Sequence, residues 1–172
     1  MKAMTMKLKL IFFAAVIFLP SFAFANHDLG NGTKYMPMDT TDVYKNACGS
    51  CHVAYHPGLL PSRSWAKIID EENAHPGGPL SLDEKEKAEV KNYLAQNSAE
   101  NSQEKRSKKI MDSIGGGTPV MISEIPYIKR KHHEINQEVF ARKAIGSRGN
   151  CIACHKNAVS GVYDDDDVVI PK

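Results

Sequence analysis

The chain has 172 residues, with 22 basic and 20 acidic side chains and a formal net charge of +2 at pH 7. This length allows one domain or two small ones. The near-neutral balance excludes the strongly basic composition typical of nucleic-acid-binding proteins.

Residues 1–25 have the features of an export signal peptide. Three lysines precede and enter an almost wholly apolar run over 8–22, and small residues surround a cleavage point near Ala25. An uncleaved membrane anchor is the alternative, but the apolar run is short for a membrane span and contains a proline. Cleavage removes the three lysines, so the exported chain has 147 residues, a net charge of −1 and no membrane span.

A first helix is predicted to lead into a cysteine motif. Residues 39–42 supply N-cap candidates, and apolar residues follow at helical spacing up to the sequence Cys-Gly-Ser-Cys-His at 48–52. The related sequence Cys-Ile-Ala-Cys-His occupies 151–155, and the two motifs contain every cysteine of the chain. This five-residue pattern is typical of a c-type haem attachment site.

The spacing within each motif has a physical reason. On a helical turn, residues i and i+3 share a face, so two sulfurs can reach the two vinyl groups of one porphyrin. The histidine at i+4 falls on the same face and reaches the iron as its proximal ligand. We therefore predict two covalent haem c groups, with these attachment cysteines and proximal ligands: Cys48, Cys51 and His52; Cys151, Cys154 and His155.

A CxxC pair can also be a zinc site or a redox-active dithiol. Here a histidine directly follows each pair, no cysteine is left over and an export signal precedes both. These three features together favour haem.

Two loops and two helices are predicted between the first motif and the middle of the chain. Prolines mark an extended or turning loop over 56–61, after which Ser64 is a candidate cap for a helix through Ile69. Residues 75–79 contain two prolines and two glycines and cannot form a regular helix. The sequence Ser-Leu-Asp-Glu at 81–84 is a candidate capping box for a further helix.

The middle of the chain is the predicted domain boundary. Residues 96–109 are almost entirely polar, which indicates a solvated helix or a linker, and three glycines from Gly115 onward end the segment. We therefore expect one haem domain over 26–97 and a second over 98–172.

The second half contains two predicted elements before its haem motif. Residues 119–128 are expected to be extended, and 136–145 are expected to form a helix. After the motif, four aspartates at 164–167 lack the spacing and the glycine of a calcium-binding loop, so a solvated acidic turn is the preferred interpretation.

The sixth ligand of each iron decides whether the protein transfers electrons or binds small molecules. His75 is the candidate for the first haem, because its loop could place the imidazole over the opposite porphyrin face. His56 is too close to His52 to reach around the ring, and His27 lies near a terminus that we expect to be exposed.

For the second haem the position in the sequence does not choose between two adjacent histidines, His132 and His133. On a helix their side chains diverge, so only one can face the iron. Met111 and Met121 are rival ligands, although methionine often serves as ordinary apolar filling.

Two runs of the sequence resemble the bacterial dihaem cytochrome c family known as DHC. The first run is the motif-containing segment 48–65 together with the later His75. The second comprises 122–127, the His-His-Glu-Ile sequence at 132–135, the second haem motif and the closing segments 161–163 and 170–171.

The resemblance implies a mainly α, loop-rich fold with two small haem-binding domains, of which the N-terminal one is cytochrome-c-like and the C-terminal one less regular. It also implies a periplasmic electron carrier with two low-potential haems, each ligated by two histidines. The family's distal ligands correspond to His75 and to His132, and the additional His133 departs from the family pattern. The expected partners are redox proteins, either an oxygen-binding haem protein of the sphaeroides haem protein type or a membrane cytochrome b.

Electron transfer without a bound substrate is therefore the leading functional hypothesis. A small haem enzyme, such as a dihaem peroxidase, or a haem-based ligand sensor would need one iron with an open or releasable position. This chain has a histidine available for each distal position. It also has only about half the length expected of a dihaem peroxidase.

Overall fold

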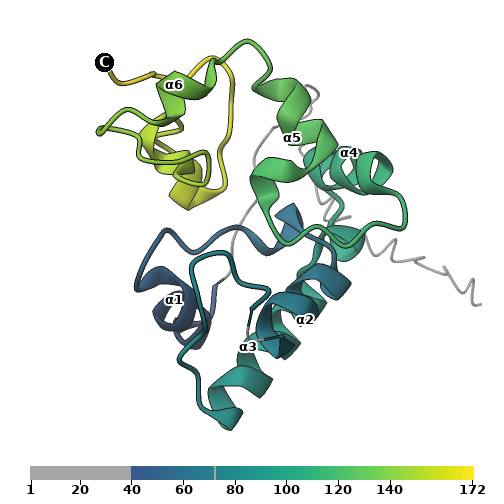
Figure 1. Cartoon of the computed structure of the whole chain (residues 1–172). Helices are drawn as coiled ribbons and strands as arrows, with labels where there is room; N and C mark the ends of the chain where they lie inside the picture. Colours follow the sequence, from purple (N-terminus) through teal and green to yellow (C-terminus); the bar gives the residue numbers. More distant parts are fainter. Residues whose placement is uncertain (1–39, 72) are drawn as a thin grey trace, which may run out of the picture. The chain divides into compact units, whose positions relative to one another are not determined.

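The computed structural model describes residues 40–71 and 73–172 (Figure 1). These residues form helices and loops, and within them the only β-structure is an isolated bridge between His155 and Val168. The expected mainly α, loop-rich fold is confirmed. The α-helices are α1 (Asp42–Gly49), α2 (Ser62–Asp70), α3 (Glu84–Gln96), α4 (Lys105–Ile114), α5 (Pro126–Lys131) and α6 (Gln137–Phe140). Single 3-10 turns are η1 (Pro57–Leu59), η2 (Ala99–Asn101), η3 (Ile122–Glu124), η4 (Cys151–Ala153) and η5 (Ala158–Ser160).

Helix α1 carries the start of the first haem motif. The Thr41 side chain caps it by accepting a hydrogen bond from the Tyr44 amide at 3.2 Å. The helix ends at Gly49, so Cys48 lies in its last turn and Cys51 and His52 lie in the turn that follows.

Helix α2 begins three residues earlier than the sequence suggested. Pro61 takes the N-cap position, and Ser64 is buried inside the helix instead of capping it. The helix is fixed to the preceding turn by Trp65, whose indole N–H donates to the Pro57 carbonyl oxygen at 2.8 Å.

Helix α3 does begin with a capping box, but at a different residue. Asp83 accepts hydrogen bonds from two helix amides, and the Asp83 amide in turn donates to the Glu86 carboxylate at 3.1 Å. The prediction that Ser81 caps this helix is wrong. Aspartate is an equally good cap, and it places an acidic partner at the third helical position as the motif requires.

One main core joins the first three helices to residues beyond the predicted domain boundary. Ile110 of α4 and Ile125 are completely buried in the cluster that contains Tyr44 of α1 and Leu94 of α3. The polar segment also contacts the first half directly, because the Ala99 amide donates to the Leu60 carbonyl at 3.0 Å. The division into 26–97 and 98–172 stays a prediction.

Two element predictions in the second half are wrong. Residues 119–128 are not extended, because they contain η3 and the start of α5, where Pro126 occupies the first helical position. The helix expected over 136–145 is a single turn, α6, after which the chain turns at Ala141.

The second haem motif lies in a region with a small core of its own. Phe140, Ile145 and Ala153 form the buried cluster there. The C-terminal tail crosses this region, since the Val169 amide donates to the Cys154 carbonyl at 3.1 Å. Lys131 forms an ion pair with Asp165 at 2.8 Å, which fixes the acidic turn to the end of α5.

The expected signal peptide, cleavage point, His27 and membrane-anchor alternative all lie outside the described residues. Among the residues that are described, no helix is long and apolar enough to cross a membrane.

Candidate haem sites

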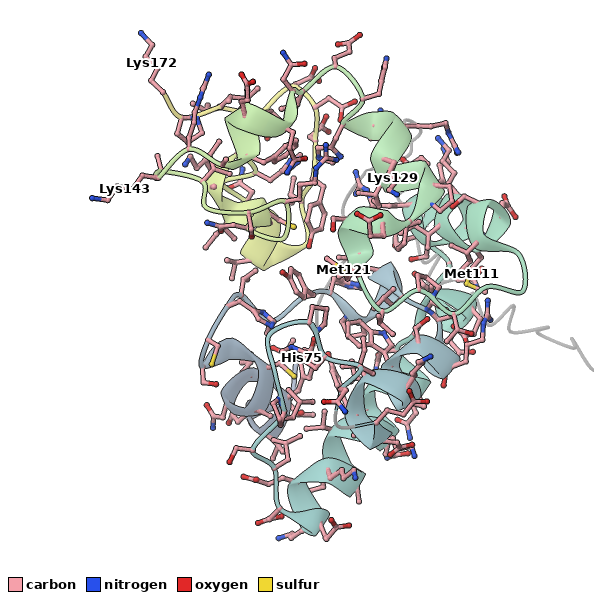
Figure 2. The ribbon with its side chains drawn as sticks, viewed as in Figure 1. His75, Met111, Met121, Lys129, Lys143 and Lys172 are labelled. Atoms are coloured by element: carbon pink, nitrogen blue, oxygen red, sulfur yellow. The ribbon has the colours of Figure 1, made fainter. Side chains whose placement is uncertain are left out.

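The first candidate site lies where α1 ends and the loop between α2 and α3 returns toward it. Figure 2 shows His75 on that loop. The His75 and His52 ring centres are 6.0 Å apart, and their planes differ by 23°. Cys48 is half-buried, and Cys51 is exposed.

The second candidate site combines the end of α5 with the turn η4. The ring centres of His132 and His155 are also 6.0 Å apart, with planes that differ by 77°. Phe140 of the small core lies beside His132, with ring centres 6.4 Å apart. Cys151 and Cys154 are both half-buried.

The spacing of the two imidazole pairs can be compared with that of two ligands on one metal ion. Because a metal–imidazole bond is about 2 Å long, imidazoles on opposite sides of one metal have ring centres about 6 Å apart. Both observed pairs have this separation. The residues present therefore fit a group that binds one imidazole on each side.

Backbone carbonyls fix the orientation of three of these four rings. Nδ1 of His52, His75 and His132 lies 2.7 to 2.8 Å from the carbonyl oxygens of Val53, Gly78 and Ile128, respectively. A carbonyl oxygen only accepts hydrogen bonds, so Nδ1 must carry the proton in each ring. The other nitrogen, Nε2, is then left with the free electron pair that a metal ligand needs.

His155 has no such carbonyl partner in residues 40–71 and 73–172. Burial is the main influence on its pKa and lowers it; the neighbouring His132 and Arg106 lower it further, while Asp165 raises it. A lowered pKa favours the neutral imidazole, the form that binds a metal. Its Nδ1 is buried and has no hydrogen-bond partner among the described residues.

The remaining histidines have other environments. His133 is exposed and lies beside Glu134, with Nδ1 2.7 Å from the Arg130 carbonyl. His56 is buried and caps η1, because its Nδ1 accepts a hydrogen bond from the Gly58 amide at 3.0 Å. This bond leaves no free electron pair on Nδ1 for a metal.

The two rival methionines have surface environments. Met111 is in α4, where it lines a surface hollow with Glu100 and Gln103, and Met121 directly precedes η3 and is exposed. Figure 2 labels both residues.

The cysteines do not have the properties of a redox-active dithiol. Burial raises the pKa of both Cys48 and Cys151 to about 11, whereas a reactive thiol needs a lowered pKa. Within the described part of the chain, no group of three or more histidine, cysteine or acidic side chains could hold a metal ion. Neither alternative to haem finds support in this geometry.

Two tyrosines beside the motifs were not identified from the sequence as site residues. The Tyr55 ring stacks on His52 with ring centres 4.8 Å apart, and the Tyr163 ring meets His155 edge-on at 5.8 Å. Their closeness to the motifs in the sequence was the available signal, but spacing alone does not show which way an aromatic side chain points.

A family model described as "Dihaem cytochrome c" matches residues 44–163 of this chain. That span includes both cysteine motifs and both imidazole pairs. The chain belongs to the dihaem cytochrome c family. Family membership implies two haem groups of the c type in an electron-transfer cytochrome, consistent with a protein that is not an enzyme.

Three solved structures resemble this dihaem cytochrome c. A dihaem cytochrome c from Rhodobacter sphaeroides is 33% identical over 74% of this chain and 100% of its own, with a TM-score of 0.64. A second structure, of DHC purified from the same organism, is 34% identical with the same coverage and a TM-score of 0.58. The dihaem cytochrome c of Shewanella baltica OS155 is 32% identical over 76% of this chain and 92% of its own, with a TM-score of 0.60. No curated protein matches the chain.

Proposed function

We propose that this dihaem cytochrome c is an exported, periplasmic electron carrier in which each haem is covalently attached and has a histidine on both sides. The observation that carries the proposal is the pairing of imidazoles 6.0 Å apart in both sites. Cys48 and Cys51 would attach the first haem, between His52 and His75. Cys151 and Cys154 would attach the second, between His155 and His132.

Haem supplies a one-electron couple between ferric and ferrous iron. The surrounding residues of this chain orient the ligands. The carbonyl oxygens of Val53, Gly78 and Ile128 accept hydrogen bonds from Nδ1–H, which raises the basicity of Nε2 and favours the ferric state. This arrangement supports low potentials and outer-sphere transfer, with no substrate bound at either iron.

An enzyme or a ligand sensor is the alternative function, and it requires one iron with an open position. The paired imidazoles favour the electron carrier, because in each site a second ring lies where a substrate or a gas would have to bind. The partners we propose are redox proteins, either an oxygen-binding haem protein of the sphaeroides haem protein type or a membrane cytochrome b. The export signal over 1–25 supports periplasmic contact with them.

Carbon monoxide tests this proposal directly. We expect the dithionite-reduced protein to keep the spectrum of two six-coordinate, low-spin haems when carbon monoxide is added, because imidazole occupies both axial positions. Absorbance spectroscopy before and after the addition is the measurement. Rapid binding at either haem would favour the enzyme or sensor instead.

Single substitutions of His132 and His133 should have opposite results. His132→Ala removes the ring opposite His155, so the second haem should become high-spin, whereas His133→Ala removes an exposed side chain and should leave both haems low-spin. Electron paramagnetic resonance of the ferric proteins distinguishes the two states. Two low-spin haems in His132→Ala, or a high-spin haem in His133→Ala, would contradict the assignment.

A further inference from the structure

Tyr55 contacts one residue close to it in the sequence and one that lies 94 positions away. Its ring stacks on His52, with ring centres 4.8 Å apart and planes that differ by 28°. Its hydroxyl donates a hydrogen bond of 2.6 Å to the Gly149 carbonyl oxygen, two residues before Cys151. One side chain therefore connects the histidine of the first motif to the main chain that enters the second motif.

Tyr163 lies against the histidine of the second motif. Its ring meets His155 edge-on, with ring centres 5.8 Å apart. Burial is the main influence on the pKa of this tyrosine and raises it. Each tyrosine ring therefore lies against the histidine of one motif, and Tyr55 also bonds to the segment that leads into the other motif.

Neighbouring groups hold both tyrosines in place. The Tyr44 hydroxyl donates to the Tyr55 carbonyl oxygen, which fixes the Tyr55 backbone. Arg106 donates to the Tyr163 carbonyl oxygen at 2.9 Å, and its guanidinium lies 5.1 Å from the centre of the Tyr163 ring. Both tyrosines are therefore half-buried side chains whose backbones are fixed by hydrogen bonds.

The hydrogen bond from Tyr55 also depends on the glycine at position 149. A Cβ atom on Gly149 would lie 3.1 Å from the Tyr55 hydroxyl oxygen, so the hydroxyl would have to shift by a few tenths of an ångström. Glycine at this position lets the hydroxyl reach the backbone without displacement.

We propose that Tyr55 is a positioning residue for electron exchange between the two haems. The inference rests on the proposed function. In the exchange, one electron passes from one site to the other, so that ferrous iron is oxidised at the donor and ferric iron is reduced at the acceptor. No proton moves and no bond forms or breaks. Tyr55 keeps its oxidation state and holds the two motifs at a fixed separation and orientation.

The test compares Tyr55→Phe with wild-type protein that contains both haems. Phenylalanine keeps the ring on His52 and removes only the hydroxyl that bonds to Gly149. Tyr127→Phe is the matched control, because Tyr127 is half-buried against the main core and lies away from both motifs in the sequence. Interhaem exchange is measured by pulse radiolysis of the half-reduced protein, and amide hydrogen exchange is measured over 149–154.

We expect Tyr55→Phe to slow interhaem exchange and to reduce the protection of these amides by about fivefold each, which corresponds to the loss of one neutral hydrogen bond. Haem content and low-spin spectra should not change. Tyr127→Phe should match the wild type in all four measurements. If Tyr55→Phe retains both haems and the wild-type exchange rate, the proposal is wrong.

Gly149→Ala tests the same bond from its acceptor side. The added methyl group displaces the Tyr55 hydroxyl from the Gly149 carbonyl. Tyr55 and Tyr163 are themselves unchanged, so the same slowing of interhaem exchange is expected. This variant decides the matter if Tyr55→Phe does not fold, and an unchanged exchange rate in it would also overturn the proposal. Failure of the proposed function has a different signature, since the wild type itself would then lack two six-coordinate haems.

Discussion

His75→Ala should convert the first haem from six-coordinate and low-spin to five-coordinate and high-spin in the ferric protein. The reduced variant should bind one carbon monoxide molecule per chain, whereas the wild type should bind none. The physical reason is that His75 supplies the only imidazole found opposite His52 in the described structure. His56 cannot replace it, because that ring is buried in the cap of η1. Absorbance spectroscopy and carbon monoxide titration measure both changes.

Met121→Leu is the matched control for this prediction. Met121 is the rival ligand that lies exposed on the protein surface, so its replacement should leave both spectra unchanged. A sulfur-to-iron charge-transfer band in the wild type that disappears in Met121→Leu would show ligation by methionine. A low-spin first haem in His75→Ala would likewise show that another residue is the distal ligand.

The cysteine motifs and the helix before the first one could be predicted because their determinants are local. Thr41 caps α1 through the amide of Tyr44, three residues later, and the helix ends at Gly49 inside the first motif. The sequence also contains the signal for α5, since Pro126 begins it, but the apolar residues around this proline suggested an extended segment. The helical conformation there depends on Ile125, which is completely buried in a core built mostly from the first half. Such tertiary contacts override a local pattern.

The choice between His132 and His133 shows why the site could be predicted only in part. Both residues follow α5 directly and are adjacent, so their positions in the sequence do not show which one faces His155. Ile128 determines the orientation of His132 in the structure. It packs against the main core, and its carbonyl oxygen accepts a hydrogen bond from the His132 ring. His132 therefore turns toward His155, while His133 stays exposed. The partner of a long-range pair depends on how the chain packs, which the spacing of residues does not reveal.

The same reasoning applies to His75. The loop over 75–79 could be recognised from its prolines and glycines, but its conformation could not. In the structure, the Gly78 amide donates to the His75 carbonyl at 3.0 Å, and the His75 ring bonds to the Gly78 carbonyl at 2.8 Å. Gly78 has a φ of +105°, a backbone conformation that favours glycine. This tight turn aims the imidazole at His52.

Loss of the second haem should unfold its surroundings, whereas loss of the first should leave part of the main core folded. Among the described residues, the main core has eleven buried members from several helices, but the cluster beside the second motif has only three. A small region with so little buried apolar surface depends on its cofactor for stability. The two haems are therefore expected to contribute unequally to local folding.

The double substitution Cys151→Ser and Cys154→Ser tests this difference. The purified protein should lose the mass of one haem, and amides over 137–172 should lose protection from hydrogen exchange by more than about tenfold, as in metal-dependent domains without their metal. Amides of α2 and α3 should keep their protection, because these helices pack against each other in the main core.

The matched variant carries Cys48→Ser and Cys51→Ser. It should also lose one haem. Leu94 of α3 and Ile110 of α4 are almost completely buried among protein side chains. The loss of amide protection in these two helices should therefore be much smaller than the loss over 137–172 in the first variant. Equal loss of protection throughout the chain in both variants would show that the two regions unfold together. In that case the hydrogen bonds from Tyr55 to Gly149 and from Arg106 to Tyr163 would couple the second site to the main core more strongly than its own small cluster indicates.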